Sequence, residues 1–423
     1  MFPSRRRIAV ITAAAALLLT PAVEATVAAE PRPTPEQETA RDTAIYTVPN
    51  TDSRSRTAIM RNGALVLSVR DGTATVEATP QQAARLREAG FELRGKREIT
   101  DALPPASGNG LTAGFPPQDR DYHTYTEMVA ELGTAVAEHP GLAVQSSAGS
   151  SAMGRDIPVL KISDNVTADE NEPEVLFTCN QHAREHLTTE MCLHIVQRYT
   201  DGYASDPAIA EMVDTREIWI VPMVNPDGSV HDVSGVTYRG WRRNRESTPT
   251  DLNRNWGHKW GCCGGSSGDP NASTYRGPAP FSAPETSAIR DFTDSRVIDG
   301  EQQITAHIDF HTFSELVLWP YGYTENNTAP GMTREEYDRF ARTGRAMAAT
   351  NGYTPQQSSD LYVTDGSVND WMWAEHDILS FTFEMYPASG GIEGFYPPDE
   401  VIPRETARND AAVSILLREA GRV

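Results

Sequence analysis

The sequence predicts an α/β protein in which a small α/β module precedes one large domain, whose mostly parallel or mixed twisted sheet is covered by helices on both faces. Three observations predict this fold. Apolar, strand-like runs alternate with helical stretches after residue 114, which is typical of a sheet covered on both faces. A Gly-, Pro- and Ser-rich segment at 104–110 is typical of a linker. The length of 423 residues allows one large domain and a smaller one.

Residues 1–29 predict a secretory signal peptide. Arginines occupy positions 5–7, an apolar stretch covers 8–20, and small residues at 27–29 offer a cleavage site. The apolar stretch is shorter than the roughly 20 residues that span a bilayer, and an uncleaved anchor is the alternative. We therefore expect a secreted, extracellular protein, with the general and twin-arginine export routes both open.

The small module falls within residues 30–113. It contains two predicted strands, at 64–69 and 73–77, and a helix at 80–89. Because exposed linkers are favoured sites of proteolysis, we interpret 30–113 as a pro-region that an activating protease removes. A permanent N-terminal domain is the alternative.

The large domain is predicted over residues 114–423. Thr333 with Glu336, and Ser282 with Glu285, match the capping box that opens a helix. In folds of this kind the active site lies beyond the carboxyl ends of strands. The predicted strands are 157–162, 174–178, 217–224, 304–309, 315–319 and 379–384.

The net charge of −21 disfavours nucleic acid and anionic membrane surfaces as partners, because a strongly acidic protein repels phosphate groups. No segment after the signal peptide is long and apolar enough to cross a membrane. We expect neither kind of partner, and we expect a monomer.

The four cysteines are too few for a disulfide scaffold. Cys179 ends a predicted strand and Cys192 falls in the next helix, so a disulfide between them can form; two buried thiols are the alternative. Cys262 and Cys263 lie in a Gly-rich loop without a His or further Cys at zinc-finger spacing, and their thiol state stays open.

Three side chains predict a metal site. His182 and Glu185 are three positions apart, so on a helical turn they share a face and reach one ion. His311, at the end of another strand, supplies a third ligand, and two histidines with one carboxylate form the ligand set of a catalytic zinc peptidase. Glu384, at the end of a buried strand, supplies the base that is not a ligand.

A second interpretation of the same string is open. His182, Glu185 and His186 match the inverted zincin motif, in which both histidines bind zinc and the glutamate is the base. That motif needs one continuous helix, whereas a strand here leads almost directly into His182. The first interpretation is therefore favoured.

The chain resembles the zinc carboxypeptidases of the funnelin type, and most of all the bacterial secreted carboxypeptidase T-like enzymes. The resemblance covers about 114–420, and the ordered set of motifs is specific although each motif alone is weak. The motifs are Gln181-His-Ala-Arg-Glu185, Trp241-Arg242, Thr250-Asp-Leu-Asn-Arg-Asn-Trp256, Phe310-His311, Pro320-Tyr-Gly-Tyr323 and Phe381-Thr-Phe-Glu384.

The resemblance implies a zinc metallocarboxypeptidase that hydrolyses the C-terminal peptide bond of peptides and proteins. His182, Glu185 and His311 would bind one zinc ion, Glu384 would be the general base, and Arg242 would polarise the scissile carbonyl and stabilise the oxyanion.

The resemblance also implies a clamp for the terminal carboxylate of the substrate, made by Asn253, Arg254 and Tyr362. A guanidinium fork suits a carboxylate. A surface ion pair is the alternative for Arg254, as it is for Arg242, and a packed loop tyrosine is the alternative for Tyr362.

Two positions depart from the family pattern. Phe313 stands where many members carry tyrosine, so a hydroxyl is absent. Asn369 stands where relatives carry an apolar residue or an aspartate. With Thr364, Thr382 and Leu318 it predicts a mildly polar pocket of broad specificity, for neutral and some basic C-terminal residues.

A loop between residues 163 and 174 predicts a calcium site, because carboxylates in a tight loop suit Ca²⁺. A solvated acidic loop is the alternative. The acidic side chains are Asp164, Asp169, Glu170, Glu172 and Glu174.

Two further functions stay open on the same fold. One is a cell-wall muropeptide amidase or peptidase, which the carboxylate clamp disfavours. The other is a non-catalytic binding protein, which the retained ligands and base disfavour.

Overall fold

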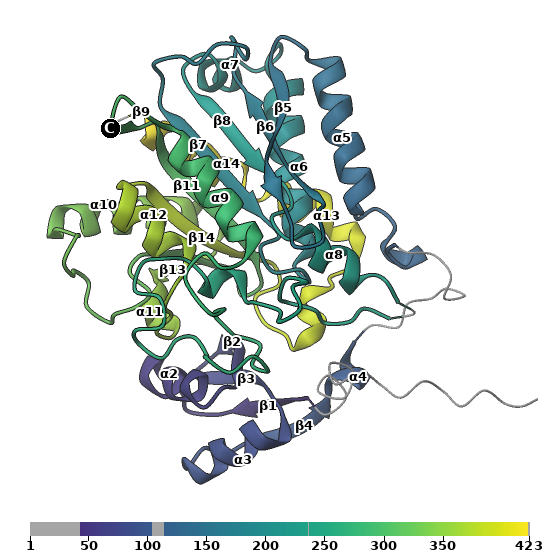
Figure 1. The fold of residues 1–423 in the computed structure, drawn as a ribbon, viewed down its shortest axis with the longest axis vertical. Helices are drawn as coiled ribbons and strands as arrows, with labels where there is room; N and C mark the ends of the chain where they lie inside the picture. The colour runs from purple at the N-terminus through teal and green to yellow at the C-terminus, as the bar shows by residue number, and fades with distance from the viewer. Residues whose placement is uncertain (1–42, 104–113, 236, 422–423) are drawn as a thin grey trace, which may run out of the picture.

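The computed structural model describes residues 43–103, 114–235 and 237–421, and its fold is drawn in Figure 1. The predicted signal peptide and the predicted linker lie outside these residues. Among the described helices, none combines the length and the apolar character that crossing a membrane requires.

The N-terminal module is a four-stranded antiparallel sheet in the order β2-β3-β1-β4, with helices packed on it. The strands predicted at 64–69 and 73–77 and the helix predicted at 80–89 are confirmed, whereas the first helix and the first and last strands were not predicted. The elements are β1 (Ala44–Val48), α2 (Ser53–Arg61), β2 (Leu65–Arg70), β3 (Thr73–Ala78), α3 (Pro80–Glu88), β4 (Arg94–Glu98) and α4 (Ile99–Ala102).

The large domain contains a mixed eight-stranded sheet whose four central strands, β14, β11, β7 and β8, are parallel. All six predicted strands are present, and the two edge strands, β13 and β5, were not predicted. In sheet order the strands are β13 (Thr354–Gln357), β12 (Leu316–Trp319), β14 (Leu379–Met385), β11 (Ile304–Thr312), β7 (Glu174–Cys179), β8 (Glu217–Val221), β6 (Asp156–Ile162) and β5 (Ala143–Ser150).

Helices cover both faces of this sheet, as predicted (Figure 1). One apolar core joins the sheet to α5 (Tyr125–Glu138), α6 (His186–Asp201), α10 (Arg334–Asn351) and α14 (Asp410–Ala420). A second core joins the other face to α9 (Pro284–Ser295) and α12 (Val368–His376). The remaining α-helices of the described large domain are α7 (Pro207–Val213), α8 (Pro226–Asp232), α11 (Ser358–Leu361) and α13 (Ile402–Ala407), and a short strand pair is formed by β9 (Val297–Ile298) and β10 (Glu301–Gln302).

One of the two predicted capping boxes is correct. Thr333 caps α10, and the side chain of Glu336 reaches back to the Thr333 backbone. The box predicted for Ser282 and Glu285 is wrong, because α9 begins at Pro284 without a side-chain cap. Glu285 is instead buried, where it accepts hydrogen bonds from the Ala152 N–H and the Asn244 amide.

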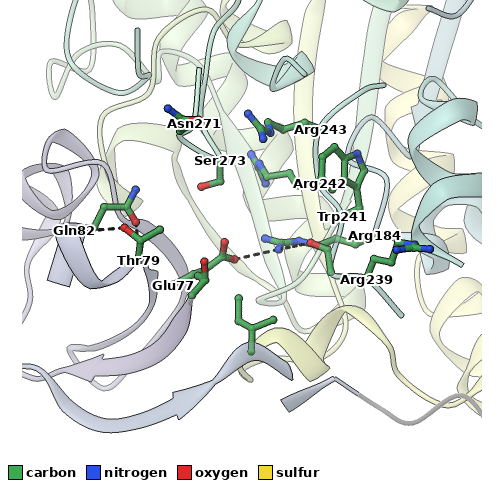
Figure 2. A pocket seen from close by; sticks show the side chains of 13 residues that line it. Glu77, Thr79, Gln82, Arg184, Arg239, Trp241, Arg242, Arg243, Asn271 and Ser273 are labelled. Atoms are coloured by element: carbon green, nitrogen blue, oxygen red, sulfur yellow. Dashed lines mark hydrogen bonds and ion pairs between the residues drawn. The ribbon is translucent and has the colours of Figure 1, made fainter. Parts of the chain in front are cut away.

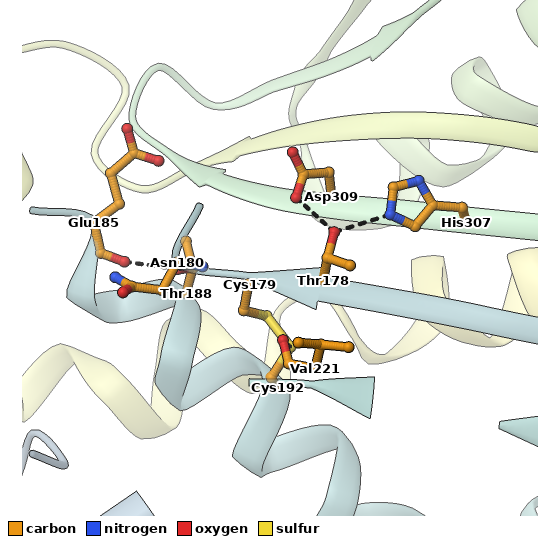
Figure 3. The surroundings of a disulfide bond; sticks show 9 residues. All are labelled: Thr178, Cys179, Asn180, Glu185, Thr188, Cys192, Val221, His307 and Asp309. Atoms are coloured by element: carbon orange, nitrogen blue, oxygen red, sulfur yellow. Dashed lines mark hydrogen bonds between the residues drawn. A yellow bond between two sulfur atoms is a disulfide. The ribbon is translucent and has the colours of Figure 1, made fainter. Parts of the chain in front are cut away.

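A disulfide joins Cys179 and Cys192, a pairing that the sequence left open, and it ties the end of β7 to the helix α6 that follows it (Figure 3). It therefore braces the turn between them, which contains His182 and Glu185. Cys262 and Cys263 form a second disulfide between neighbouring residues.

Candidate active site

Three of the sequence-predicted ligands meet at the carboxyl ends of the parallel strands. The Glu185 carboxylate lies 2.9 Å from His182 Nδ1 and 2.8 Å from His311 Nδ1, and the two Nδ1 atoms are 3.0 Å apart. All three side chains are buried. Two imidazole nitrogens and a carboxylate within reach of one another are donors that fit zinc, so these residues could hold the ion.

The local structure explains why these donors converge. His182 and Glu185 lie in the turn between β7 and α6, with Glu185 at the N-cap of the helix. The Thr188 hydroxyl donates to the Glu185 carbonyl and accepts from the Asn180 N–H, which closes the turn. His311 is the penultimate residue of β11, the strand that pairs with β7.

Glu384 reaches the same point through strand pairing. Strands β11 and β14 are parallel neighbours in a register that places His311 opposite Glu384. Burial raises the pKa of the Glu384 carboxyl to about 8, and the Glu185 charge adds to the effect although His311 opposes it. A dication at the ligand cluster would lower that pKa again.

Two buried carboxylates that sequence reasoning missed orient the histidines. Asp251 accepts hydrogen bonds from His182 Nε2 (3.1 Å) and from Arg242 (3.0 Å). Asp309 contacts His311 Nε2 on the same face of β11, two residues earlier. Such partners fix the ring orientation and raise the basicity of a ligating imidazole. The spacing of Asp309 and His311, with side chains alternating along a strand, could have revealed the second pair.

Arg242 is held close to the ligands. Its guanidinium is bound to Asp251 and lies 3.9 Å from Glu185. Although burial alone would lower the pKa of Arg242, Asp251 and Glu185 raise it, so the side chain remains a buried cation. The alternative of a surface ion pair is excluded for this arginine, because its side chain is only 10% exposed.

His186 lies outside the ligand cluster. Its Nε2 is 2.8 Å from Asp232, and its Nδ1 faces the Ser229 hydroxyl. The structure therefore favours His311 over His186 as the second histidine ligand, which argues against the inverted zincin interpretation.

A cavity of about 70 Å³ opens beside the ligands and contains the residues predicted to bind substrate. Arg254 is fixed in its wall by hydrogen bonds from its guanidinium to the carbonyls of Gly265 and Asn253. The lining comprises His182, Arg242, Asn253, Arg254, His311, Leu318, Ser358, Leu361, Tyr362, Thr364, Ser367, Asn369, Thr382 and Glu384.

The structure explains why position 313, one of the two that differ from the family pattern, holds phenylalanine in place of tyrosine. It is buried and contacts Phe395 with ring centroids 4.9 Å apart. Both belong to an apolar cluster that the large domain shares with the N-terminal module, where a tyrosine hydroxyl would need a buried partner.

The five acidic residues of the 163–174 loop do not form the single cage that was predicted. Asp164, Glu170 and Glu172 form one group of oxygens. Asp169 and Glu174 turn instead to Arg296, which forms ion pairs with both carboxylates. Asp169 and Glu174 lie near Glu217 in a second group of carboxylates. The calcium prediction stays a prediction, and the Arg296 cation disfavours it at Asp169 and Glu174 relative to the first group.

A metal-ligand set with a carboxylate and an arginine beside it, at the strand ends of a covered α/β sheet, defines a metal-dependent hydrolase. The zinc carboxypeptidase family matches residues 128–412 of the chain. A zinc carboxypeptidase of Saccharothrix mutabilis subsp. capreolus is 46% identical in sequence, over an alignment that covers 99% of this chain and 97% of the relative's length. Carboxypeptidase A1 of Mus musculus is 33% identical in sequence, over 67% of this chain and 66% of the relative's length.

The fold agrees with these relatives. The crystal structure of the carboxypeptidase A from Helicoverpa armigera covers 91% of this chain and 98% of that chain, with a TM-score of 0.72 and 24% sequence identity. The chain therefore belongs to the zinc carboxypeptidase family and is a metallocarboxypeptidase.

The ligand assignment predicts the effect of two substitutions on bound zinc. His311→Ala removes a donor, so we expect the purified protein to lose most of its zinc. His186→Ala is the matched control and should keep about one zinc ion per chain. Elemental analysis of dialysed protein measures both, and zinc loss with His186→Ala alone would contradict the assignment.

Proposed function

We propose that this chain is a secreted zinc carboxypeptidase that removes single residues from the C-termini of peptides and proteins. The observation that carries the proposal is one cavity, lined by the two histidines of the ligand cluster and by Glu384 together with Arg254 and Tyr362. A carboxylate bound at the arginine would place the last peptide bond of a substrate beside the ligands. Secretion is inferred from residues 1–29.

His182, Glu185 and His311 would hold the zinc ion, which supplies Lewis-acid chemistry when bound. Glu384 takes a proton from the attacking water and delivers it to the leaving amine. Arg242 donates hydrogen bonds to the scissile carbonyl oxygen as negative charge develops there. Because Asp251 already fixes the Arg242 guanidinium, little reorganisation accompanies the reaction.

The substrate carboxylate would be held by Asn253, Arg254 and Tyr362. Arg254 is buried, and the hydrogen bonds to backbone carbonyls leave it without a carboxylate partner among the described residues. A buried guanidinium of this kind favours an incoming carboxylate.

The pocket supports broad specificity for neutral and some basic C-terminal residues. Asn369 accepts a hydrogen bond from Thr382, and its Nδ2 is buried without a partner in the described part of the chain. Glu384 is the one acidic residue in the described lining, so the pocket offers no second carboxylate to a basic side chain. The hydroxyl groups of Ser358 and Thr364 can accept hydrogen bonds from it.

The activity is tested by digesting peptides that end in Phe or Arg and reading the products by mass spectrometry. We expect stepwise loss from the C-terminus, abolished by a zinc chelator. Glu384→Gln should lower kcat by about 100-fold or more, whereas Glu138→Gln, on the exposed face of α5, should leave it unchanged. Internal cuts, or cleavage of muropeptides alone, would contradict the proposal. If the enzyme cleaves neither the peptide that ends in Phe nor the one that ends in Arg, the proposed broad specificity is contradicted.

The N-terminal module supports a further part of the proposal, that the chain is secreted as a zymogen. Residues 65–68 of β2 line a cavity with Glu384, Arg242 and Tyr362, so the module covers the reacting groups. Arg56 donates to the Leu361 carbonyl (2.6 Å), and the Val363 N–H donates to the Thr57 hydroxyl (2.9 Å). The module thus holds both neighbours of Tyr362.

Cleavage between the two domains should release activity. We expect the intact chain to hydrolyse peptides at least about ten-fold more slowly than the same protein after limited proteolysis within 104–113. Activity is measured before and after the cut, with intact mass confirming its position. Equal activity of the two forms would show that the module is a permanent domain.

We also propose a structural calcium ion at Asp164, Glu170 and Glu172. Buried carboxylate oxygens of Glu170 and Glu172 have no hydrogen-bond partner among the described residues. Burial and the nearby Glu170 charge raise the pKa of Glu172 and of Asp164. A hard cation would relieve both effects.

Calcium should raise the Tm of the zinc-loaded protein by a few degrees, because an ion that binds only the folded state stabilises it. Differential scanning calorimetry with calcium and with magnesium measures the shift, and Glu172→Gln should reduce it. A Tm that calcium does not change would show that this is a solvated acidic loop.

A further inference from the structure

The segment that carries Arg242, residues 239–243, borders a cavity of about 110 Å³ between the large domain and the N-terminal module, and Figure 2 shows the side chains that line it. These residues belong to no helix or strand, so their backbone is not fixed by the hydrogen bonds of regular structure. Because one side of the segment borders the cavity, the contacts that fix it come from the other side, where the ligand turn and helix α8 lie.

Asp232, the last residue of α8, connects this segment to the ligand turn. One oxygen of its carboxylate accepts a hydrogen bond from the backbone N–H of Trp241 (2.6 Å), and the other accepts from His186 Nε2 (2.8 Å). Trp241 directly precedes Arg242, and His186 directly follows Glu185. A single carboxylate therefore joins the chain neighbours of two side chains that lie 3.9 Å apart in the site.

Tyr396 supports the same connection. Its hydroxyl donates to the Asp232 carboxylate (3.0 Å) and accepts from the backbone N–H of Gly240 (3.0 Å). Its ring stacks on that of Tyr238, with centroids 4.1 Å apart. All of these residues belong to the large domain, so removal of the module takes none of these hydrogen bonds away.

Helix α8 is itself fixed between the two segments. The Asn225 side-chain amide, at its N-terminus, donates to the carbonyls of Gln181 and Arg243 (3.2 and 3.1 Å). A methyl group at Gly228 would lie 2.7 Å from both the Ala183 side chain and the Arg243 carbonyl oxygen, which is too close for any side chain. Because α8 fits this closely, a shift of Asp232 would be transmitted to the segment of Arg242.

We propose that Asp232 is a positioning residue for the reaction, which holds Arg242 at the place where its guanidinium meets the scissile carbonyl oxygen. The inference rests on the role of Arg242 in the proposed function, and it adds a residue that lines neither the substrate pocket nor the ligand cluster. Asp251 orients the Arg242 guanidinium, whereas Asp232 would fix the backbone from which that side chain extends. A displacement of about 1 Å can lower a reaction rate by about 100-fold.

The test replaces Asp232 by asparagine, which keeps the size of the side chain. Because an amide has one oxygen, it can accept from Trp241 or from His186 but not from both. The enzyme is the full chain after limited proteolysis between its domains, and the substrate is a peptide that ends in Phe. We expect kcat to fall about ten-fold or more and KM to change less than about two-fold, since the carboxylate clamp is untouched. Bound zinc should stay at about one ion per chain.

Asp227→Asn is the matched control. Asp227 is a buried residue of the same helix, and its carboxylate accepts from the Met153 N–H and the Arg155 guanidinium. Neither partner is among the described residues that line the substrate pocket. This variant loses a comparable buried acceptor, so we expect a similar fall in Tm and an unchanged kcat.

A binding measurement without turnover gives a second readout. A phosphonate analogue of the peptide presents the charged tetrahedral oxygen that Arg242 would meet, whereas free phenylalanine reaches only the carboxylate clamp. In Asp232→Asn, calorimetric titration should show about ten-fold weaker binding of the phosphonate and unchanged binding of phenylalanine.

Each outcome separates the inference from the proposed function. Equal kcat for Asp232→Asn and Asp227→Asn, or an equal loss of affinity for both ligands, would overturn the inference while the carboxypeptidase activity stands. If Asp232→Asn does not fold, Tyr396→Phe decides, because it removes only the hydroxyl between Asp232 and Gly240. A lower kcat at unchanged KM then supports the inference, and an unchanged kcat overturns it. If the unsubstituted enzyme shortens no peptide, the proposed function fails and the inference fails with it.

Discussion

The site depends on one buried carboxylate, Glu185, which is shared by two histidines. A buried charge is costly unless it is paired, so the groups around it must alternate in sign or polarity. The structure meets this requirement with six side chains, each of which contacts the next. In order they are Asp309, His311, Glu185, His182, Asp251 and Arg242. Because each group is held by the next, the three side chains proposed to bind zinc and the arginine are positioned before a substrate arrives.

The parts of the fold that could be predicted are those in which burial imposes a clear pattern. The six predicted strands of the large domain include all four central parallel strands, which are apolar because both faces are covered. Three of the missed strands, β5, β13 and β4, are sheet edges, and β4 consists largely of exposed charged residues; β1, which was also missed, is an interior strand. At an edge, pairing is decided by the neighbouring strand, so the sequence of the edge strand carries little signal.

The site shows the same division. His182, Glu185, His311 and Glu384 were expected to lie together, and they do, because His311 and Glu384 lie at the ends of paired apolar strands and His182 and Glu185 share the turn after another. Asp251 was missed because its role depends on a contact with His182, 69 residues away in the chain. Asp309 is only two residues from His311 and could have been found from the alternation of side chains along a strand. Contacts between distant segments also bear on two expectations that rested on local sequence, the calcium site in the acidic loop and the capping role of Glu285. Arg296 lies more than a hundred residues from the acidic loop that it neutralises, and the capping role expected of Glu285 gave way to buried hydrogen bonds with Ala152 and Asn244. Asp164, Glu170 and Glu172, the other three residues expected to bind calcium, lie close together in the folded chain.

The register between β11 and β14 separates the chemistry of this enzyme from its selectivity. His311 and Glu384 face each other as strand partners, and a shift of one residue would turn one of them to the opposite face of the sheet. Asn369, in contrast, comes from α12, outside both strands, and contacts β14 through a hydrogen bond from Thr382. Under the proposed roles, a substitution at Asn369 would change which C-terminal residues the enzyme accepts and leave the strand register intact, whereas an insertion in either strand would separate His311 from Glu384. The fold thus leaves one part of the site free to evolve while the other stays fixed.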